Sequence, residues 1–333
     1  MKSQFVGSLH DGQNVDSVFA LRSRESRATR AGDTFLALEL ADRSGSMPAV
    51  MFRPTQVAQS VPSGTVVAIK GVVTRYRGVQ RVLVKAMEPV DDYDRTDLIP
   101  GTTRDTHELL AELRSLIHSV EDPLLARVLR AVFRDKEFVN RFTQCPGSIS
   151  RHHAYIGGLL EHTVSVATMC RHVATLYPDL DVDLLVTGAI LHDIGKVDEI
   201  AFDTAIEMTS TGRLIGHVLL GERRVRDVLL SFGPDVPALR ADRLAHVLLS
   251  HHGEREWGAA VQPSMFEAVV LHHVDELDAN AAAFVDVVRA AARLDEEWTD
   301  ASNQFERALS VPSPSPVSGG AAHAAVVSLR RGA

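Results

Sequence analysis

The sequence is poor in cysteine and has no long apolar run. Cys145 and Cys170 are too few for a disulfide framework and lack the CxxC spacing of a zinc knuckle, so we expect two reduced thiols. No apolar run reaches the roughly 18 residues of a membrane-spanning helix, and the opening MKSQFVGSLHDGQ lacks the apolar core of a signal peptide. These absences predict a soluble, cytoplasmic protein with no membrane partner.

The chain is long enough for two domains, and its charge is divided unevenly between them. Residues 1–90 contain 12 Lys and Arg against 7 Asp and Glu, a net of +5, whereas the rest contains 23 against 36, a net of −13. An excess of this size also occurs by ordinary scatter. It also fits a small module that faces a nucleic acid.

The first 90 residues show the pattern of short strands. Apolar and polar residues alternate or β-branched residues gather over 34–42, 48–53, 65–76 and 79–87, with turn-forming residues between them. Gly71 interrupts one run at a point where a strand must bend. About five strands of this size predict a small all-β barrel, an OB-fold, over residues 1–90.

Beyond a polar linker at 91–104 the periodicity becomes helical. We predict an all-α helical bundle over 105–307 and a disordered tail, rich in Pro, Ser, Gly and Ala, over 308–333. The predicted helices cover 105–119, 121–134, 158–176, 183–195, 214–231, 240–252, 262–277 and 279–297.

Histidines are concentrated in this second domain, where eleven of the fifteen lie between residues 152 and 273. A single histidine on an apolar helix face is usually a satisfied core residue. Five or six of them with two carboxylates each need a partner, and a divalent cation satisfies several at once. The candidate ligands are His162, His192, Asp193, His217, His251, His252 and Asp275.

The ligand types and the stretch ILHDIGK indicate the chemistry of such a site. Imidazole and carboxylate without thiolate suit Mn, Fe, Co, Ni or Zn. Asp193, next to His192, can bridge two cations, and two cations about 3.5 to 4 Å apart suit hydrolysis at phosphorus. Lys196, one turn later, is either a solvated helix-end lysine or a partner for a substrate phosphate.

The ordered set H, HD, H, HH, D with its HDxGK core resembles the HD superfamily of metal-dependent phosphohydrolases. Phrases such as 152-HHAYIGGLLEHTVSVA-167, 250-SHHGEREWG-258 and 64-GTVVAIKGVVTRYRG-78 are similar to YhaM-type 3′-to-5′ exoribonucleases, which place an OB-fold before an HD domain. The resemblance covers about residues 5–290. It implies an OB-fold barrel followed by an HD-domain bundle.

The resemblance also implies roles for individual residues. One metal ion would be held by His162, His192, Asp193 and Asp275, and a second by Asp193, His217 and His251. His252 and His153 are left as metal or substrate contacts, Lys196 corresponds to a phosphate-contacting lysine, and Glu161 and Asp278 would orient ligands. We expect two divalent ions, with Mn²⁺ the first choice, and Asp193 and Lys196 as the catalytic residues.

The implied reaction is hydrolysis of the 3′-terminal phosphodiester of single-stranded RNA, or also DNA, with release of nucleoside 5′-monophosphates. The basic barrel would hold the strand through residues on and around one hairpin and one neighbouring strand: Phe35, Arg75, Tyr76, Arg77 and Arg81. Phe52 is either a further stacking residue or part of the barrel core. A homo-oligomer is a further expectation.

Two other functions remain open at the level of sequence. One is a cyclic-dinucleotide phosphodiesterase of the HD-GYP class, although GEREWGAAVQP after the histidine pair contains no GYP-like segment. The other is a single-strand-binding protein whose HD domain is only a scaffold, although every expected ligand is present.

Overall fold

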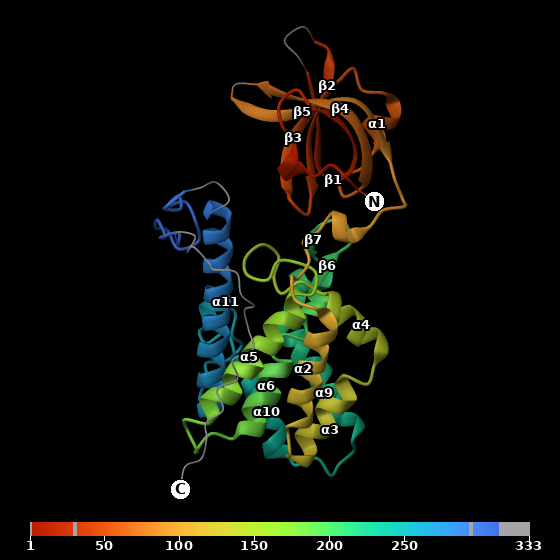
Figure 1. The fold of residues 1–333 in the computed structure, drawn as a ribbon. Coiled ribbons are helices and arrows are strands. Elements are labelled where there is room, and N and C mark those ends of the chain that lie inside the picture. Colours follow the sequence, from red (N-terminus) through yellow and green to blue (C-terminus); the bar gives the residue numbers. More distant parts are fainter. Residues whose placement is uncertain (1, 29–31, 77, 293–295, 313–333) are drawn as a thin grey trace. The chain divides into compact units, whose positions relative to one another are not determined.

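A computed structural model describes residues 2–28, 32–76, 78–292 and 296–312. The chain forms two compact units, Met1–Asn280 and Ala281–Ala333. Figure 1 shows the strands of the N-terminal barrel and the helices that follow it in the chain.

Five strands close the N-terminal barrel, as predicted. They are β1 (Asn14–Ala28), β2 (Thr34–Asp42), β3 (Gly45–Phe52), β4 (Val66–Tyr76) and β5 (Val79–Pro89), with the short helix α1 (Gln56–Ser60) between β3 and β4. Their order is β1-β2-β3-β5-β4, and β4 pairs again with β1. The register between β4 and β5 shifts at Gly71, where an added Cβ would lie 2.5 Å from the Leu83 carbonyl oxygen. Gly71 is therefore required at this bend.

The helical domain follows the linker. Its helices in the first unit are α2 (Thr106–His118), α3 (Pro123–Val132), α4 (Lys136–Gln144), α5 (Gly158–Ala174), α6 (Val182–Leu191), α7 (Lys196–Glu199), α8 (Ser210–Ile215), α9 (His217–Ser231) and α10 (Ala238–Ser250), and α11 spans Phe266–Ala292.

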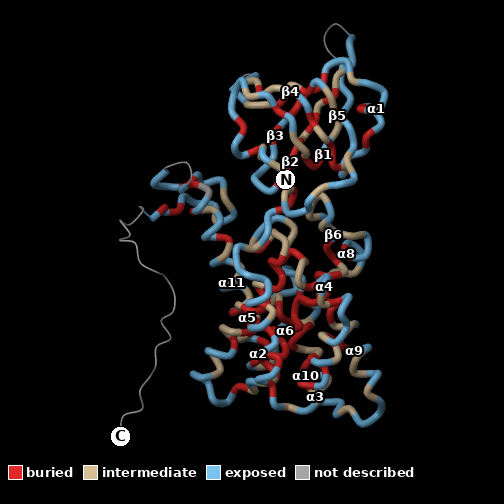
Figure 2. Tube along the Cα trace, turned by 45° about the vertical axis from the view of Figure 1, so that its right-hand side comes forward, coloured by how far each residue is buried: buried red, intermediate tan, exposed pale blue. Residues whose placement is uncertain are grey.

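Helix α6 is the centre of this domain. The Asp181 side chain accepts a hydrogen bond from the Leu184 amide and caps the helix N-terminus. Every residue from Leu184 to Leu191 is buried, so α6 is apolar on all sides, as a helix surrounded by other helices must be. Buried residues concentrate along α5 and α6 in Figure 2. The site residues at the end of α6 are therefore held in the domain core.

Several predicted elements differ from the structure. The predicted helices 262–277 and 279–297 are one continuous helix, α11, and the predicted helix 183–195 ends at Leu191 because the chain turns at His192 and Asp193. Helix α4 was not predicted, nor was the hairpin of β6 (Ile200–Phe202) and β7 (Ile206–Met208), which departs from an all-α domain. These segments are too short for periodicity to reveal.

The second unit has a small core of its own. Val288, Ala291, Leu309 and Val311 pack together, and Trp298 forms an isolated β-bridge with Ser310. Residues 308–312 of the predicted tail are thus part of this unit, and residues 313–333 lie outside the described residues.

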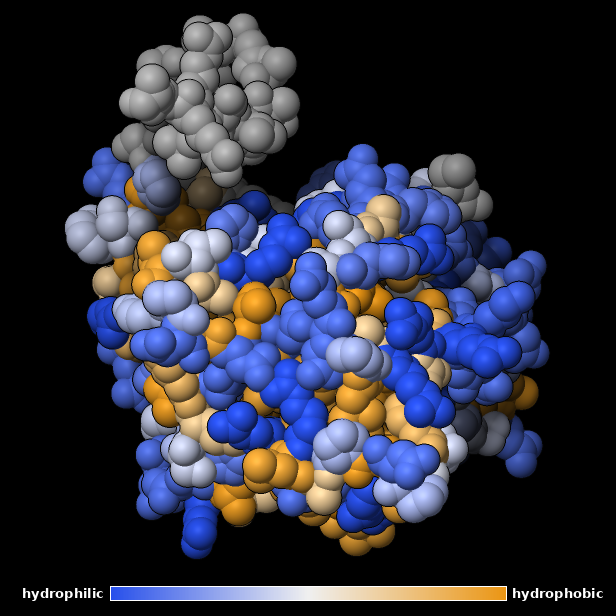
Figure 3. All heavy atoms as spheres, turned by 90° about the horizontal axis from the view of Figure 1, so that it is seen from below, coloured by the Kyte–Doolittle hydropathy of each residue, from blue (hydrophilic) through white to orange (hydrophobic). Residues whose placement is uncertain are grey.

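Both cysteines are free, as predicted, and both are buried. Among the residues that the structure describes, no helix combines the length and the apolarity that a membrane crossing requires. The face shown in Figure 3 mixes hydrophilic side chains with apolar ones.

Candidate functional site

The predicted ligands converge because several helices end or begin at one place. His192 and His251 are the C-terminal cap residues of α6 and α10, and His217 is the first residue of α9. His162 lies within α5 and Asp275 within α11. His162, His192, Asp193 and His251 are buried, while His217, His252 and Asp275 are half-buried.

The hydrogen bonds of the imidazole rings fix their orientation. Nδ1 of His192 lies 2.8 Å from the Ala189 carbonyl oxygen, and Nδ1 of His251 lies 2.7 Å from that of Leu248. Both carbonyls belong to the last turn of the helix that the histidine caps, where carbonyls lack helical partners. Each ring therefore satisfies a helix end and turns Nε2 outward from it.

In three further rings Nδ1 also faces an oxygen atom. Nδ1 of His162 faces the Asp278 carboxylate at 2.8 Å, that of His217 faces Glu199 at 3.0 Å, and that of His252 faces the Trp257 carbonyl at 2.8 Å. Because an ionised carboxylate or a carbonyl accepts but does not donate, Nδ1 carries the hydrogen in all five rings. In a neutral ring Nε2 then holds a lone pair.

These lone pairs point at one another. Nε2 of His162 lies 3.1 Å from Nε2 of His192, and Nε2 of His217 lies 3.0 Å from Nε2 of His252. Two lone pairs at this distance repel unless a positive charge lies between or beside them. The arrangement requires protons or cations.

The two oxygens of Asp193 face two different groups of these rings. Oδ2 lies 3.5 Å from Nε2 of His162 and 3.3 Å from that of His192. Oδ1 lies 3.4 Å from Nε2 of His217 and 3.8 Å from that of His251. Asp275 adds an oxygen to the first group, 3.1 Å from Nε2 of His162.

Two atoms at the centre have no hydrogen-bond partner among the described residues. They are Oδ1 of Asp193 and Nε2 of His251, and both are buried. Unpartnered buried acceptors cost free energy, and a cation coordinated by both would remove that cost. The imidazole and carboxylate ligand atoms, the orientation of the rings and these two unpartnered atoms all fit divalent metal ions. Two compact groups of ligand atoms could each hold an ion: one of His217, His251 and His252, and one of His162, His192 and Asp193.

The pKa values of two of the histidines differ because their neighbours differ. Burial lowers the pKa of His162, but hydrogen bonds to Asp275 and Asp278 raise it to about 9. Burial, reinforced by the neighbouring rings of His252 and His192, holds the pKa of His251 well below its usual value. His251 therefore stays neutral.

Lys196 lies at the edge of this centre. Its ammonium group donates to Oδ2 of Asp193 at 2.5 Å and to the Gly147 carbonyl oxygen at 2.7 Å. Burial would lower its pKa, but the Asp193 charge raises it above the usual value, so the side chain stays charged. Lys196 is buried rather than a solvated helix-end residue.

His153 is placed beside the centre but is held by other residues. Its Nδ1 lies 2.8 Å from the Tyr155 hydroxyl, and its Nε2 lies 2.9 Å from Oδ2 of Asp278. Glu161 accepts hydrogen bonds from Thr102 and Tyr155 instead of contacting a ligand ring. His153 and Asp278 thus form a layer behind His162.

Two groups that orient the histidines were not predicted from the sequence. Glu199 accepts hydrogen bonds from both the amide and the ring of His217. His272 contacts the His251 carbonyl oxygen through Nδ1 at 3.0 Å. Both are recognisable only from the fold, because Glu199 lies 18 positions before His217 and His272 lies 21 positions after His251.

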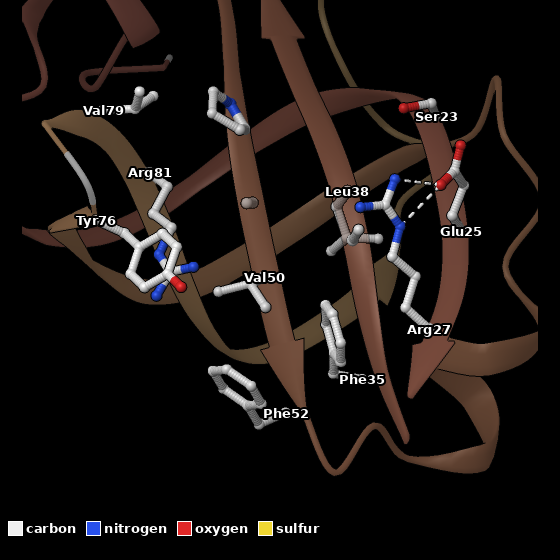
Figure 4. A pocket seen from close by; sticks show the side chains of 13 residues that line it. Ser23, Glu25, Arg27, Phe35, Leu38, Val50, Phe52, Tyr76, Val79 and Arg81 are labelled. Carbon is white, nitrogen blue, oxygen red and sulfur yellow. Dashed lines mark hydrogen bonds and ion pairs between the residues drawn. The ribbon is translucent and has the colours of Figure 1, made fainter. Parts of the chain in front are cut away.

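A groove of about 690 Å³ lies on the barrel surface. Phe35, Phe52, Tyr76 and Arg81 line it and lie along one side of the strands (Figure 4). The Phe35 and Phe52 ring centroids are 5.7 Å apart, and the Arg81 guanidinium lies 4.3 Å from the Tyr76 ring centroid. Phe52 is 48% exposed, so it belongs to the groove and not to the core.

The remaining two barrel candidates are Arg75 and Arg77. Arg75 is exposed but does not line this groove. Arg77 lies outside the described residues.

Replacing Gly195 of the HDxGK segment by alanine should destabilise the helical domain. A Cβ at this position would lie 2.0 Å from the His217 carbonyl oxygen and 2.6 Å from the Gly221 amide nitrogen, so α7 and α9 would have to separate. We expect Gly195→Ala to cost about 1 to 3 kcal/mol, measured by urea unfolding.

Gly101→Ala is the matched control, because its Cβ would meet only the Ile156 carbonyl oxygen, at an ordinary 3.8 Å. Equal stability of the two variants would contradict the close packing of α7 on α9.

Comparison with known proteins identifies both domains. Residues 19–90 match the model of an OB-fold nucleic acid binding domain, and residues 159–280 match that of the HD domain. These matches agree with the barrel and the helical domain predicted from the sequence.

Whole-chain relatives are similar over both domains. The 3′-5′ exoribonuclease YhaM of Bacillus velezensis is 32% identical over 282 residues, which cover 81% of this chain and 87% of the relative. YhaM of Bacillus subtilis is 31% identical, with the same coverage, and YhaM of Listeria innocua is 30% identical over 81% of this chain and 86% of its own length. The chain therefore belongs to the YhaM family of 3′-5′ exoribonucleases.

Proposed function

We propose that this protein is a metal-dependent 3′-5′ exoribonuclease that releases nucleoside 5′-monophosphates. The observation that carries the proposal is the convergence of four Nε2 atoms around the Asp193 carboxylate, with Nε2 of His252 beside that of His217, in a chain that belongs to the YhaM family. Histidine-rich centres with a shared carboxylate are suited to hydrolysis of phosphodiesters.

We further propose that the centre holds two divalent ions, with Mn²⁺ the first choice and Fe, Co, Ni or Zn compatible with the same donors. His162, His192, Asp275 and Oδ2 of Asp193 would hold one ion, and His217, His251 and Oδ1 of Asp193 the other. The distance between Nε2 of His252 and that of His217 supports adding His252 to the second set. His153 would support His162 through Asp278 and not ligate.

Bound divalent ions would supply an activated water and offset charge on the phosphate oxygens. The chain's own residues would position these components. The carbonyls of Ala189 and Leu248 and the carboxylates of Asp278 and Glu199 hold the rings in one tautomer.

Lys196 would assist at the phosphate. Among the described residues it donates two hydrogen bonds, and an ammonium has three N–H donors. The third N–H group would donate to a phosphate oxygen, while the hydrogen bonds of the other two hold the ammonium group in position. Lys196 would then contribute both to the Asp193 geometry and to binding of the substrate.

We propose that residues 1–90 bind single-stranded RNA, and that the helical domain over 105–307 cleaves it. Phe35, Phe52 and Tyr76 would stack on bases, while Arg81, with Arg75 and Arg77 nearby in sequence, would contact phosphates. Binding of single-stranded DNA, cytoplasmic location and a homo-oligomer remain predictions from the sequence.

The activity is tested with 5′-labelled RNA, the matching DNA and a cyclic dinucleotide, each with Mn²⁺ or with chelator. We expect a Mn²⁺-dependent ladder that shortens from the 3′ end of the RNA. Asp193→Ala should abolish it, because both cation positions lose an oxygen, while binding of RNA persists. Cleavage of the cyclic dinucleotide alone would replace the proposal with a cyclic-dinucleotide phosphodiesterase, and binding without cleavage under any metal would indicate a scaffold.

The barrel groove is tested by Phe52→Ala and Tyr76→Ala. Each should weaken binding of single-stranded RNA by about 1 to 3 kcal/mol, the usual contribution of one stacked base, in a fluorescence anisotropy titration. Val57→Ala is the control, because Val57 is an exposed apolar barrel residue outside the groove. Equal affinities for all three variants would exclude the groove as the binding surface.

A further inference from the structure

Trp257 is a large aromatic residue exposed beside the metal centre. Its side chain is 58% exposed, although burial of an indole is strongly favourable. It ends the short 3-10 helix Arg255–Trp257 in the segment that follows the histidine pair. Neither the metal centre nor the barrel groove uses it.

His252 connects Trp257 directly to the centre. The His252 ring contacts the Trp257 carbonyl oxygen through Nδ1 at 2.8 Å, and its Nε2 lies 3.0 Å from that of His217. The Trp257 carbonyl therefore contacts one side of the His252 ring, while the other side of the same ring faces Nε2 of the proposed ligand His217.

The indole is held in place before any substrate arrives. The Trp257 amide donates to the Glu254 carbonyl, and the Glu254 amide donates to that of His252, so the turn is closed by its own backbone. The His272 ring stacks on the indole, with centroids 5.9 Å apart and an angle of 28° between the planes. His272 in turn contacts the His251 carbonyl oxygen, which ties the indole to the ligand segment.

From this geometry we infer that the Trp257 indole stacks on the base of the nucleotide whose phosphate lies at the metal centre. The inference rests on the proposed function and adds a binding residue to it. Stacking is tolerant of base identity because every base has a π face, so this contact would suit an enzyme that removes successive nucleotides of any sequence. His272 is then a positioning residue that supports the covered face of the indole.

The first test uses fluorescence and needs no turnover. The sequence contains two tryptophans, so Trp298→Phe leaves Trp257 as the only indole. At a fixed Mn²⁺ concentration, adenosine 5′-monophosphate should quench the emission of this variant to saturation, whereas ribose 5-phosphate, which lacks the base, should leave it unchanged. No quenching by adenosine 5′-monophosphate, or equal quenching by both compounds, would overturn the inference.

The second test is a double-mutant cycle between Trp257 and the base. Trp257→Ala should lower kcat/KM on an RNA with a natural 3′-terminal nucleotide by about fivefold to about hundredfold, with the loss in KM, and should change little on an RNA whose 3′-terminal residue is abasic. Trp257→Phe, which keeps an aromatic ring, should retain most of the activity. Equal losses on both RNAs would show a structural role only.

The two tests separate this inference from the proposed function. A protein that degrades no RNA but shows the base-dependent quenching would disprove the exonuclease and keep the stacking site. A ladder that shortens from the 3′ end, without base-dependent quenching, would keep the exonuclease and remove the stacking site.

Discussion

The Asp193 carboxylate is the group on which the rest of the helical domain depends. It is buried, and its two oxygens face two separate groups of imidazole nitrogens. A buried carboxylate needs compensating positive charge, and the Lys196 ammonium supplies part of it. Divalent cations, bound as proposed, would supply more.

The ends of helices hold two of the imidazole rings in position around the Asp193 carboxylate. A helix C-terminus leaves carbonyls without helical partners, and His192 and His251 use those carbonyls to fix their own tautomers. The hydrogen bond from Nδ1 to a helix-end carbonyl therefore caps each of the two helices and orients Nε2 of each ring. The apolar helix α6 supplies a rigid support, because a helix packed on all sides cannot shift without disturbing every neighbour.

The sequence predicted the barrel, the helical domain and the family, because each depends on a local pattern: strand alternation, helical periodicity and the ordered HD motif. It also named the residues that the structure brings together around Asp193. Spacing could not show that Glu199 orients His217, since the intervening hairpin and α8 bring them together. Nor could it show that His153 is held by Asp278, 125 positions away. Such partners depend on tertiary packing alone.

We propose that Asp193 bridges two metal ions. Crystals grown with Mn²⁺ and measured at the manganese absorption edge test it most directly. We expect two anomalous peaks about 3.5 to 4 Å apart, one beside each oxygen of Asp193. His162 and His192 should surround one peak, and His217 and His251 the other. A single peak, or two peaks that do not share Asp193, would contradict it.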